Sequence, residues 1–174
     1  MNLFKKSIAA IAATLLFANV QSQSFEGVIE FRKTTDSDTM TYVYYVKGDK
    51  VRVDEIGATY EKQEGSYIID LKAQTIVAVS NERKMYFDQP ASKTPAMLKC
   101  KPEPVKTANK KMIHNTECQE YVVKCTEENT LVTYWIATGK FDFFDRMLKL
   151  LNRKDKSAVY FQKIPGLLGA FPFL

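Results

Sequence analysis

The chain contains a single histidine, His114, so any histidine-based chemistry depends on this one residue. It lies between Ile113 and Asn115 in a polar segment where we expect a turn. A nucleophilic triad would need a nucleophile and an orienting acid beside it, and nothing in the local sequence places them there. The Gly-x-Ser-x-Gly, Gly-rich phosphate-loop and His-Glu helix motifs are also absent from the sequence. We therefore expect His114 to be a surface residue and the protein not to be an enzyme.

Cys100, Cys118 and Cys125 are the three cysteines of the chain. Cys118 and Cys125 are seven residues apart on one predicted strand, so they point to opposite faces and cannot easily bond to each other. A disulfide from Cys100 to Cys118 or to Cys125 is feasible and would leave one thiol. The alternative is that all three are small buried apolar residues. Three cysteines and one histidine do not supply metal ligands at the usual spacings, so we expect no metal and no cofactor.

Carboxylates and aromatic residues complete the set of candidates. Neighbouring acids such as Asp54 and Glu55 point to opposite faces of a strand, so they are not placed as an acid–base pair. Aromatic residues make up 12% of the chain, and several fall on predicted strands. There they could line a ligand cavity or a carbohydrate platform, although core packing is the commoner role. These strand aromatics are Tyr42, Tyr44, Tyr45, Tyr134 and Trp135.

Residues 1–22 have the three parts of a secretory signal peptide. Lys5 and Lys6 provide the positive start, residues 7–18 form an apolar run, and small or neutral residues precede a cleavage site before Gln23. The apolar run is shorter than the roughly 20 residues that cross a bilayer, which disfavours a membrane anchor. We expect an exported protein, either periplasmic or extracellular.

The mature chain, residues 23–174, has the length and composition of one domain. The full chain has a net charge of +5, and loss of the two signal lysines leaves +3. This mild excess in an exported protein argues against nucleic acid as a partner. No segment of the mature chain is long and apolar enough to predict a transmembrane helix. The sequence leaves the oligomeric state open.

Alternation with period two predicts antiparallel strands along most of the mature chain. The strongest local prediction is a hairpin of residues 39–47 and 50–56, because Gly48 can adopt the positive φ of a tight turn. Four prolines between residues 89 and 106 predict a long surface connection. The other predicted strands are residues 24–34, 66–71, 75–80, 85–88, 107–113, 118–126, 130–138 and 157–164.

Residues 141–152 change to the helical period and predict one amphipathic helix, which packs on the sheet or, alternatively, lies on a membrane surface. The strand before it is apolar on both faces and needs cover on both. One helix covers only part of a sheet face. A strongly curved sheet around it would therefore leave an apolar groove of the kind that holds acyl chains. We expect Trp135, Phe144, Met147 and Leu148 to line this groove.

The last eight residues, 167–174, are almost wholly apolar, so we expect them to be buried in the fold, bound to a partner, or cut short. The mature chain also contains the phrases FEGVIEF, YYVKGDKVRVD, YIIDLKAQTIVAVSNERKMYF, IHNTECQEYVVKC, LVTYWIAT and IPGLLGAFPF. Together they resemble a family of exported bacterial proteins of unknown function, which is similar to the periplasmic lipoprotein carrier LolA and its acceptor LolB.

This resemblance implies a mainly β (α+β) fold, in which a curved antiparallel meander forms a half-barrel around one or a few helices. In the carrier, the apolar concavity holds the acyl chains of lipoproteins. No functional residue of the carrier matches a position here closely enough to carry over. Family members usually continue into a further strand after the FP phrase, so this chain could lack its last strand.

Two functional hypotheses follow. The first is an exported, non-enzymatic binding protein that holds an apolar ligand, a lipid or the acyl chains of a lipidated protein, between the sheet and the helix. The alternative is a structural or interaction module of the cell envelope with a packed interior and no ligand.

Overall fold

The computed structural model describes residues 24–34, 39–57, 63–90, 98 and 100–173. The predicted signal peptide, residues 1–22, lies outside the described residues, as does part of the predicted proline-rich connection.

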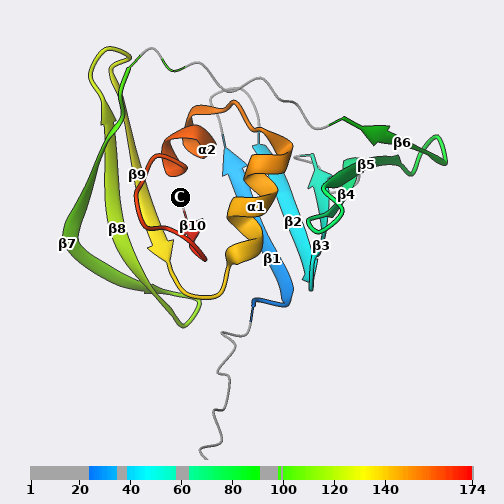
Figure 1. Ribbon diagram of the computed structural model, residues 1–174, viewed down its shortest axis with the longest axis horizontal. Helices are drawn as coiled ribbons and strands as arrows, with labels where there is room; N and C mark the ends of the chain where they lie inside the picture. The colour runs from blue at the N-terminus through cyan, green and yellow to red at the C-terminus, as the bar shows by residue number, and fades with distance from the viewer. Residues whose placement is uncertain (1–23, 35–38, 58–62, 91–97, 99, 174) are drawn as a thin grey trace, which may run out of the picture.

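Two antiparallel sheets stand on either side of two helices (Figure 1). The first sheet follows chain order: β1 (Gly27–Thr34), β2 (Thr39–Lys47), β3 (Lys50–Ile56), β4 (Gln63–Asp70), β5 (Thr75–Ser80) and β6 (Met85–Gln89). The second has the order β10 (Phe171–Phe173), β9 (Thr130–Ala137), β8 (Thr116–Cys125) and β7 (Glu103–Ile113). The helices are α1 (Asp142–Leu151) and α2 (Lys156–Phe161). The mainly β, antiparallel fold is confirmed, but the described strands divide into two sheets where one continuous sheet was predicted.

The β2–β3 hairpin, the strongest local prediction, is confirmed. Gly48 has a φ of 54°, the left-handed conformation that the turn requires. From this hairpin a buried row crosses the first sheet, because Val46, Val51, Ile69 and Ile76 pair in register on four successive strands. Their side chains face the helices and form one wall of a core that both sheets share.

Helix α1 forms as its periodicity predicts. Its buried side is Phe143, Phe144, Met147 and Leu148. The opposite side is polar, and there Arg146 donates a 2.7 Å hydrogen bond and ion pair to Asp49 in the β2–β3 turn. The helix is therefore held on the first sheet by apolar burial and by a link to the hairpin.

The predicted strand at residues 157–164 is wrong, because this segment forms the helix α2 and a following turn. The β-branched and aromatic residues of the segment favour a strand, but Asp155 caps a helix by accepting a hydrogen bond from the backbone N–H of Ala158. Val159, Tyr160 and Phe161 are all buried, which is a helical rather than an alternating pattern. A short apolar run does not distinguish the two forms by periodicity alone.

Strand β7 begins at Glu103, so it takes in part of the predicted connection, which was expected to continue to residue 106. Pro104 is accommodated because β7 is the edge strand of its sheet, where a missing backbone donor can face outward. The prolines after residue 101 therefore do not exclude a strand.

The apolar tail folds onto the protein itself. Phe171–Phe173 pairs with β9 as β10, and both Ala170 and Phe171 are buried. The turn before it makes a close backbone approach, in which Gly169 accepts hydrogen bonds from the N–H groups of Gly139 and Phe141 at 2.9 and 3.0 Å. One apolar residue of the tail, Leu168, is 82% exposed.

The outer face of β9 is only partly covered. Trp135 is half-buried, and the ammonium group of Lys111 lies 4.0 Å from the centre of its ring. Leu131 is 63% exposed, so the expectation that both faces of this strand are covered is wrong.

Within the described ranges, the two helices are too short to cross a membrane.

Candidate apolar ligand site

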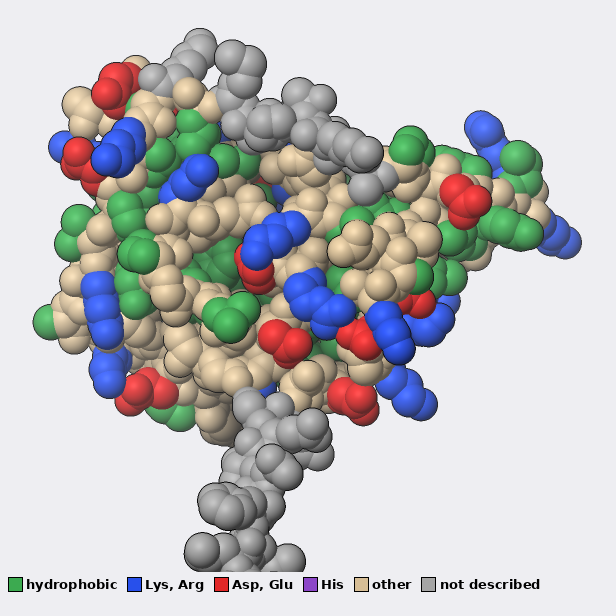
Figure 2. All heavy atoms as spheres, viewed as in Figure 1, with side chains coloured by type: hydrophobic (Ala, Val, Ile, Leu, Met, Phe, Trp, Pro, Cys, Tyr) green, Lys and Arg blue, Asp and Glu red, His purple; other side chains and the backbone are tan. Residues whose placement is uncertain are grey.

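A cavity of about 520 Å³ lies between the two sheets. Strands β1 and β2 line it from one side and β9 and β10 from the other, while α1, α2 and the loop between them complete its wall. Figure 2 shows hydrophobic side chains at the bottom of a hollow beside α1, on the face that Figure 1 presents. Of the nineteen lining residues in the described part of the chain, thirteen are aliphatic, aromatic or proline, so this wall is mainly apolar. The lining residues are Phe31, Arg32, Lys33, Thr34, Tyr42, Tyr44, Val132, Tyr134, Phe144, Leu148, Leu151, Arg153, Asp155, Ser157, Ala158, Phe161, Phe171, Pro172 and Phe173.

The four residues predicted to line a groove separate into two pairs. Phe144 and Leu148 lie in the cavity wall, and their contact with a ligand stays a prediction. Met147 is fully buried in the core, and neither it nor Trp135 lines the cavity. The helical period predicted the buried side of α1. It could not predict which residues of that side line the cavity and which pack in the core.

Aromatic rings shape the apolar part of the cavity. The ring centroid of Phe144 lies 4.7 Å from that of Phe171 and 5.6 Å from that of Phe161, so α1, α2 and β10 meet at one ring. On the other side, Phe31 of β1 packs against Tyr42 and Tyr44 of β2 at 5.2 and 5.1 Å. These contacts fix the walls in defined positions, because each ring is held by its neighbours.

Three tyrosines in the wall contribute hydroxyl groups. Burial raises the pKa of Tyr44 and of Tyr134, so both are protonated at neutral pH and can donate hydrogen bonds. Tyr134 donates to the backbone oxygen of Ser157 at 2.6 Å and thereby holds the start of α2 on β9. Tyr42 and Tyr44 were among the strand aromatics considered for a ligand cavity, and both line this one, whereas Tyr45 is exposed on the other face of β2.

One end of the cavity is polar and is built around Asp155. Its carboxylate accepts hydrogen bonds from Ser157 Oγ at 2.6 Å and from Arg153 Nε at 3.0 Å. Lys33 Nζ, at the end of β1, lies 3.7 Å from the same carboxylate. This ion pair links the loop between α1 and α2 to β1, and Lys33, Arg153 and Asp155 all line the cavity.

The environment of Asp155 stabilises its charged form. Burial by itself would raise the pKa, but the hydrogen bond from Ser157 and the charge and hydrogen bond of Arg153 outweigh burial and lower the pKa to about 2. Asp155 is therefore ionised throughout the physiological range. Its folded-state pKa lies below the ordinary value of 3.8.

We expect Asp155→Asn to lower the free energy of unfolding at pH 7 by about 1–2 kcal/mol, after allowance for solvent screening. Asparagine also caps helices, so the substitution removes the charge and keeps the cap. The difference from the unmodified protein should be nearly complete above about pH 4 and should shrink as the pH falls through 2, because the carboxylate is then protonated in the unfolded protein and increasingly in the folded protein as well. Urea unfolding of both proteins across this pH range measures it.

The matched control is Glu117→Gln, which removes an exposed ion pair with Lys110 and should change stability little at any pH. A stability difference for Asp155→Asn that stayed constant between pH 4 and pH 2 would contradict the role assigned to the carboxylate.

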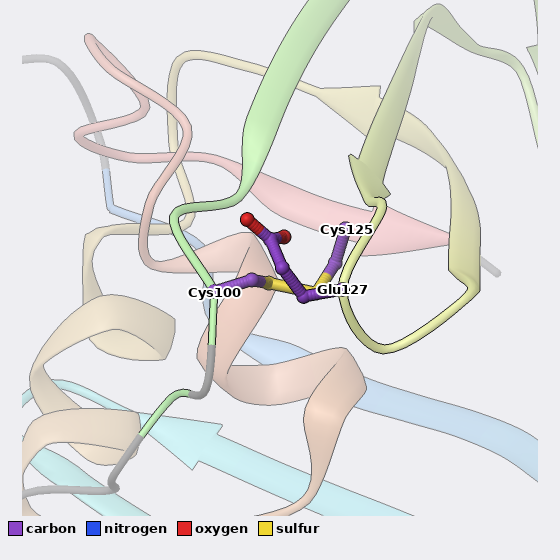
Figure 3. A group of neighbouring side chains, drawn as sticks. All are labelled: Cys100, Cys125 and Glu127. Carbon is purple, nitrogen blue, oxygen red and sulfur yellow. A yellow bond between two sulfur atoms is a disulfide. The ribbon is translucent and has the colours of Figure 1, made fainter.

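The cysteines form a separate feature away from the cavity wall. Cys100 and Cys125 are joined in a disulfide (Figure 3). Cys118 is a buried free thiol. Of the two pairings that the sequence left open, the structure therefore has the one with Cys125. The carboxylate of Glu127 lies within 4.8 Å of both sulfur atoms, a spacing that could suit a metal ion. Metal binding needs thiolates, however, and in the disulfide both sulfurs are already bonded.

The residues considered for catalysis are dispersed. His114 is exposed in the β7–β8 turn and does not line the cavity. Asp54 is buried in the first sheet, where it accepts hydrogen bonds from Ser66 Oγ at 2.9 Å and Arg52 Nε at 2.8 Å. The structure brings neither residue to a nucleophile at the cavity.

Sequence reasoning missed the polar end of the cavity and the contribution of β1 and β10. Arg153 and Asp155 follow α1 in a charged segment that resembles an ordinary helix end. The one available signal was an Asp three residues before Ala158, the spacing of a helix cap. Nothing in the sequence indicated that this cap would contact Lys33.

Comparison of the chain with protein-family models, curated proteins and solved structures finds no match.

Proposed function

We propose that this is an exported, non-enzymatic binding protein that holds an apolar ligand, a lipid or an acyl group, in the cavity between the two sheets. The observation that carries the proposal is the cavity of about 520 Å³ with its mainly apolar wall. Its volume lies in the range of ligand sites, and burial of apolar surface stabilises a complex by about 25 cal/mol per Å².

Export is supported by two independent features. The pattern of residues 1–22 is that of a secretory signal peptide, and the Cys100–Cys125 disulfide suits an oxidising compartment. We propose a periplasmic or extracellular location. The likeness to the LolA-like family and to its half-barrel stays a prediction from the sequence phrases.

A second candidate function is an interaction module of the cell envelope. It is favoured by the β5–β6 hairpin, which projects from the first sheet (Figure 1) and exposes Met85, Tyr86 and Phe87 at 57%, 78% and 58%. Exposed apolar residues of this kind mark interaction surfaces. This alternative expects a packed interior, so the cavity favours the binding protein.

The two functions differ in what the purified protein carries. If the protein holds a lipid, native mass spectrometry of the mature protein should show an added mass. Organic extraction should remove this mass, and mass spectrometry of the extract should identify it as a lipid. The interaction module instead predicts that no lipid is bound. It also predicts that the protein binds a partner, and that replacing Met85, Tyr86 and Phe87 by Ser abolishes this binding.

Filling the cavity should abolish ligand binding. We expect Leu148→Trp to lower the amount of bound lipid at least tenfold, because the indole occupies space between α1 and the wall. Overpacking costs about 1–3 kcal/mol, so circular dichroism should first show that the variant is folded. Val132→Trp fills the same space from β9 and gives an independent test.

Leu131→Trp is the matched control, since Leu131 is 63% exposed and does not line the cavity. It should carry the same lipid as the unmodified protein. Unchanged binding in both folded cavity-filling variants would place the ligand elsewhere and reject this site.

A further inference from the structure

The charge of the cavity wall has one prevailing sign. Among the lining residues that the structure describes, Arg32, Lys33 and Arg153 are basic and Asp155 is acidic. Lys33, Arg153 and Asp155 stand together at one end. The remainder of the wall is aromatic, aliphatic or neutral polar, so the cavity has a positive end and an apolar interior.

Arg153 has suitable chemistry for an anionic group. It is half-buried in the wall, where its Nε–H donates to Asp155 at 3.0 Å and fixes the orientation of the guanidinium plane. Guanidinium groups bind carboxylates and phosphates through paired N–H donors, and a partly desolvated site strengthens such bonds. Asp155 is already engaged by Ser157, Ala158 and Arg153, so it acts as a positioning residue for this guanidinium.

The volume limits how much ligand can enter. A protein cavity of about 150 Å³ holds one benzene molecule, so by the same ratio a cavity of about 520 Å³ holds roughly 20 non-hydrogen atoms. This matches one acyl chain of 16–18 carbons with its carboxylate. It is too small for the two chains of a phospholipid or the three chains of a lipoprotein anchor.

We propose that the ligand is a single-chain amphiphile with an anionic head group, whose chain lies among the aromatic rings and whose head group pairs with Arg153 and Lys33. This rests on the proposed function and narrows its ligand to one class. A long-chain fatty acid and a lysophosphatidate share this chemistry, although the glycerol phosphate of the lysophosphatidate would lie beyond the volume that its acyl chain fills.

The test is displacement of the neutral fluorescent probe N-phenyl-1-naphthylamine from the delipidated mature protein. Oleate, oleyl alcohol, oleoyl lysophosphatidate and dioleoyl phosphatidate are compared as competitors. We expect oleate or the lysophosphatidate to bind at least tenfold more tightly than oleyl alcohol, and the tighter of the two identifies the source of the head group. Decanoate, a shorter fatty acid used as a fifth competitor, should bind more weakly than oleate by about tenfold for each pair of methylenes that it lacks.

Two arginine variants separate charge recognition from packing. Arg153→Gln should remove the preference for oleate over oleyl alcohol while leaving the affinity for oleyl alcohol unchanged. Arg146→Gln is the matched control, because Arg146 is also partly exposed and paired with an aspartate, Asp49, but does not line the cavity. It should keep the full preference, which should weaken with added salt in both Arg146→Gln and the unmodified protein.

Several results would overturn the inference in distinguishable ways. Equal affinity for oleate and oleyl alcohol would reject the anionic head group and leave the apolar site standing. Dioleoyl phosphatidate binding as tightly as the lysophosphatidate would reject the limit to one chain. Failure of every competitor and of the probe to bind would reject the proposed function as well.

Discussion

Replacement of Phe171 by alanine should lower the free energy of unfolding by about 3–5 kcal/mol, the range for loss of a buried aromatic side chain. Phe171 is 2% exposed, and its ring lies within 6.5 Å of the rings of Phe141, Phe143 and Phe144, as well as of Phe173. These contacts hold the three-residue strand β10 against the start of α1, while its backbone pairs with β9. Urea unfolding followed by circular dichroism measures the loss.

Leu168→Ala is the control for this prediction, because it removes a large apolar side chain from the same tail. Leu168 is 82% exposed, so the change should alter stability by less than about 0.5 kcal/mol. If the two variants were equally stable, the tail would not be anchored through Phe171, and the wall of the cavity formed by β10 would be in question.

Loss of the Cys100–Cys125 disulfide has the second largest expected effect. The bond closes a loop with a sequence separation of 25, and the chain-entropy relation gives a loss of about 3.5 kcal/mol when it is removed. Cys100→Ser should therefore unfold at markedly lower urea concentration than the oxidised protein. Dithiothreitol should lower the stability of the oxidised protein by a similar amount.

Cys118 provides the comparison that isolates the bond. Its thiol is buried and is not part of the disulfide, so Cys118→Ala keeps the loop closed. We expect this variant to remain sensitive to dithiothreitol, whereas Cys100→Ser should not respond to it. A variant Cys100→Ser that still lost stability on reduction would show that a different disulfide, formed by Cys118 or Cys125, stabilises it.

Residues of β10 and α1 contribute both to the stability of the fold and to the proposed ligand site. Phe144 and Phe171 belong both to the shared core and to the cavity wall, so the aromatic contacts that stabilise the fold also shape the site. Ligand binding to the native state should accordingly raise stability, and the unfolding midpoint should increase with ligand concentration. This dependence gives a second readout for the binding variants.

The elements that could be predicted from the sequence are those with a complete local signal. The β2–β3 hairpin has alternating strands on both sides of a glycine in its turn, and α1 has a full helical period with one apolar side. Helix α2 was not predicted, because its six residues are too few to show a helical period. Asp155 caps this helix by accepting a hydrogen bond from the backbone N–H of Ala158, and a cap favours the helical form.

The sequence by itself therefore determined a mainly β fold with antiparallel strands, one amphipathic helix and an excess of apolar residues over what a single sheet face can bury. Only the tertiary structure decided that the strands form two sheets, that Cys100 pairs with Cys125, and that Lys33 meets Asp155. The reason is physical. Periodicity reports which face of an element is apolar, but a cavity and its charged end depend on which distant elements face each other across the core, and that is set by packing of the whole chain.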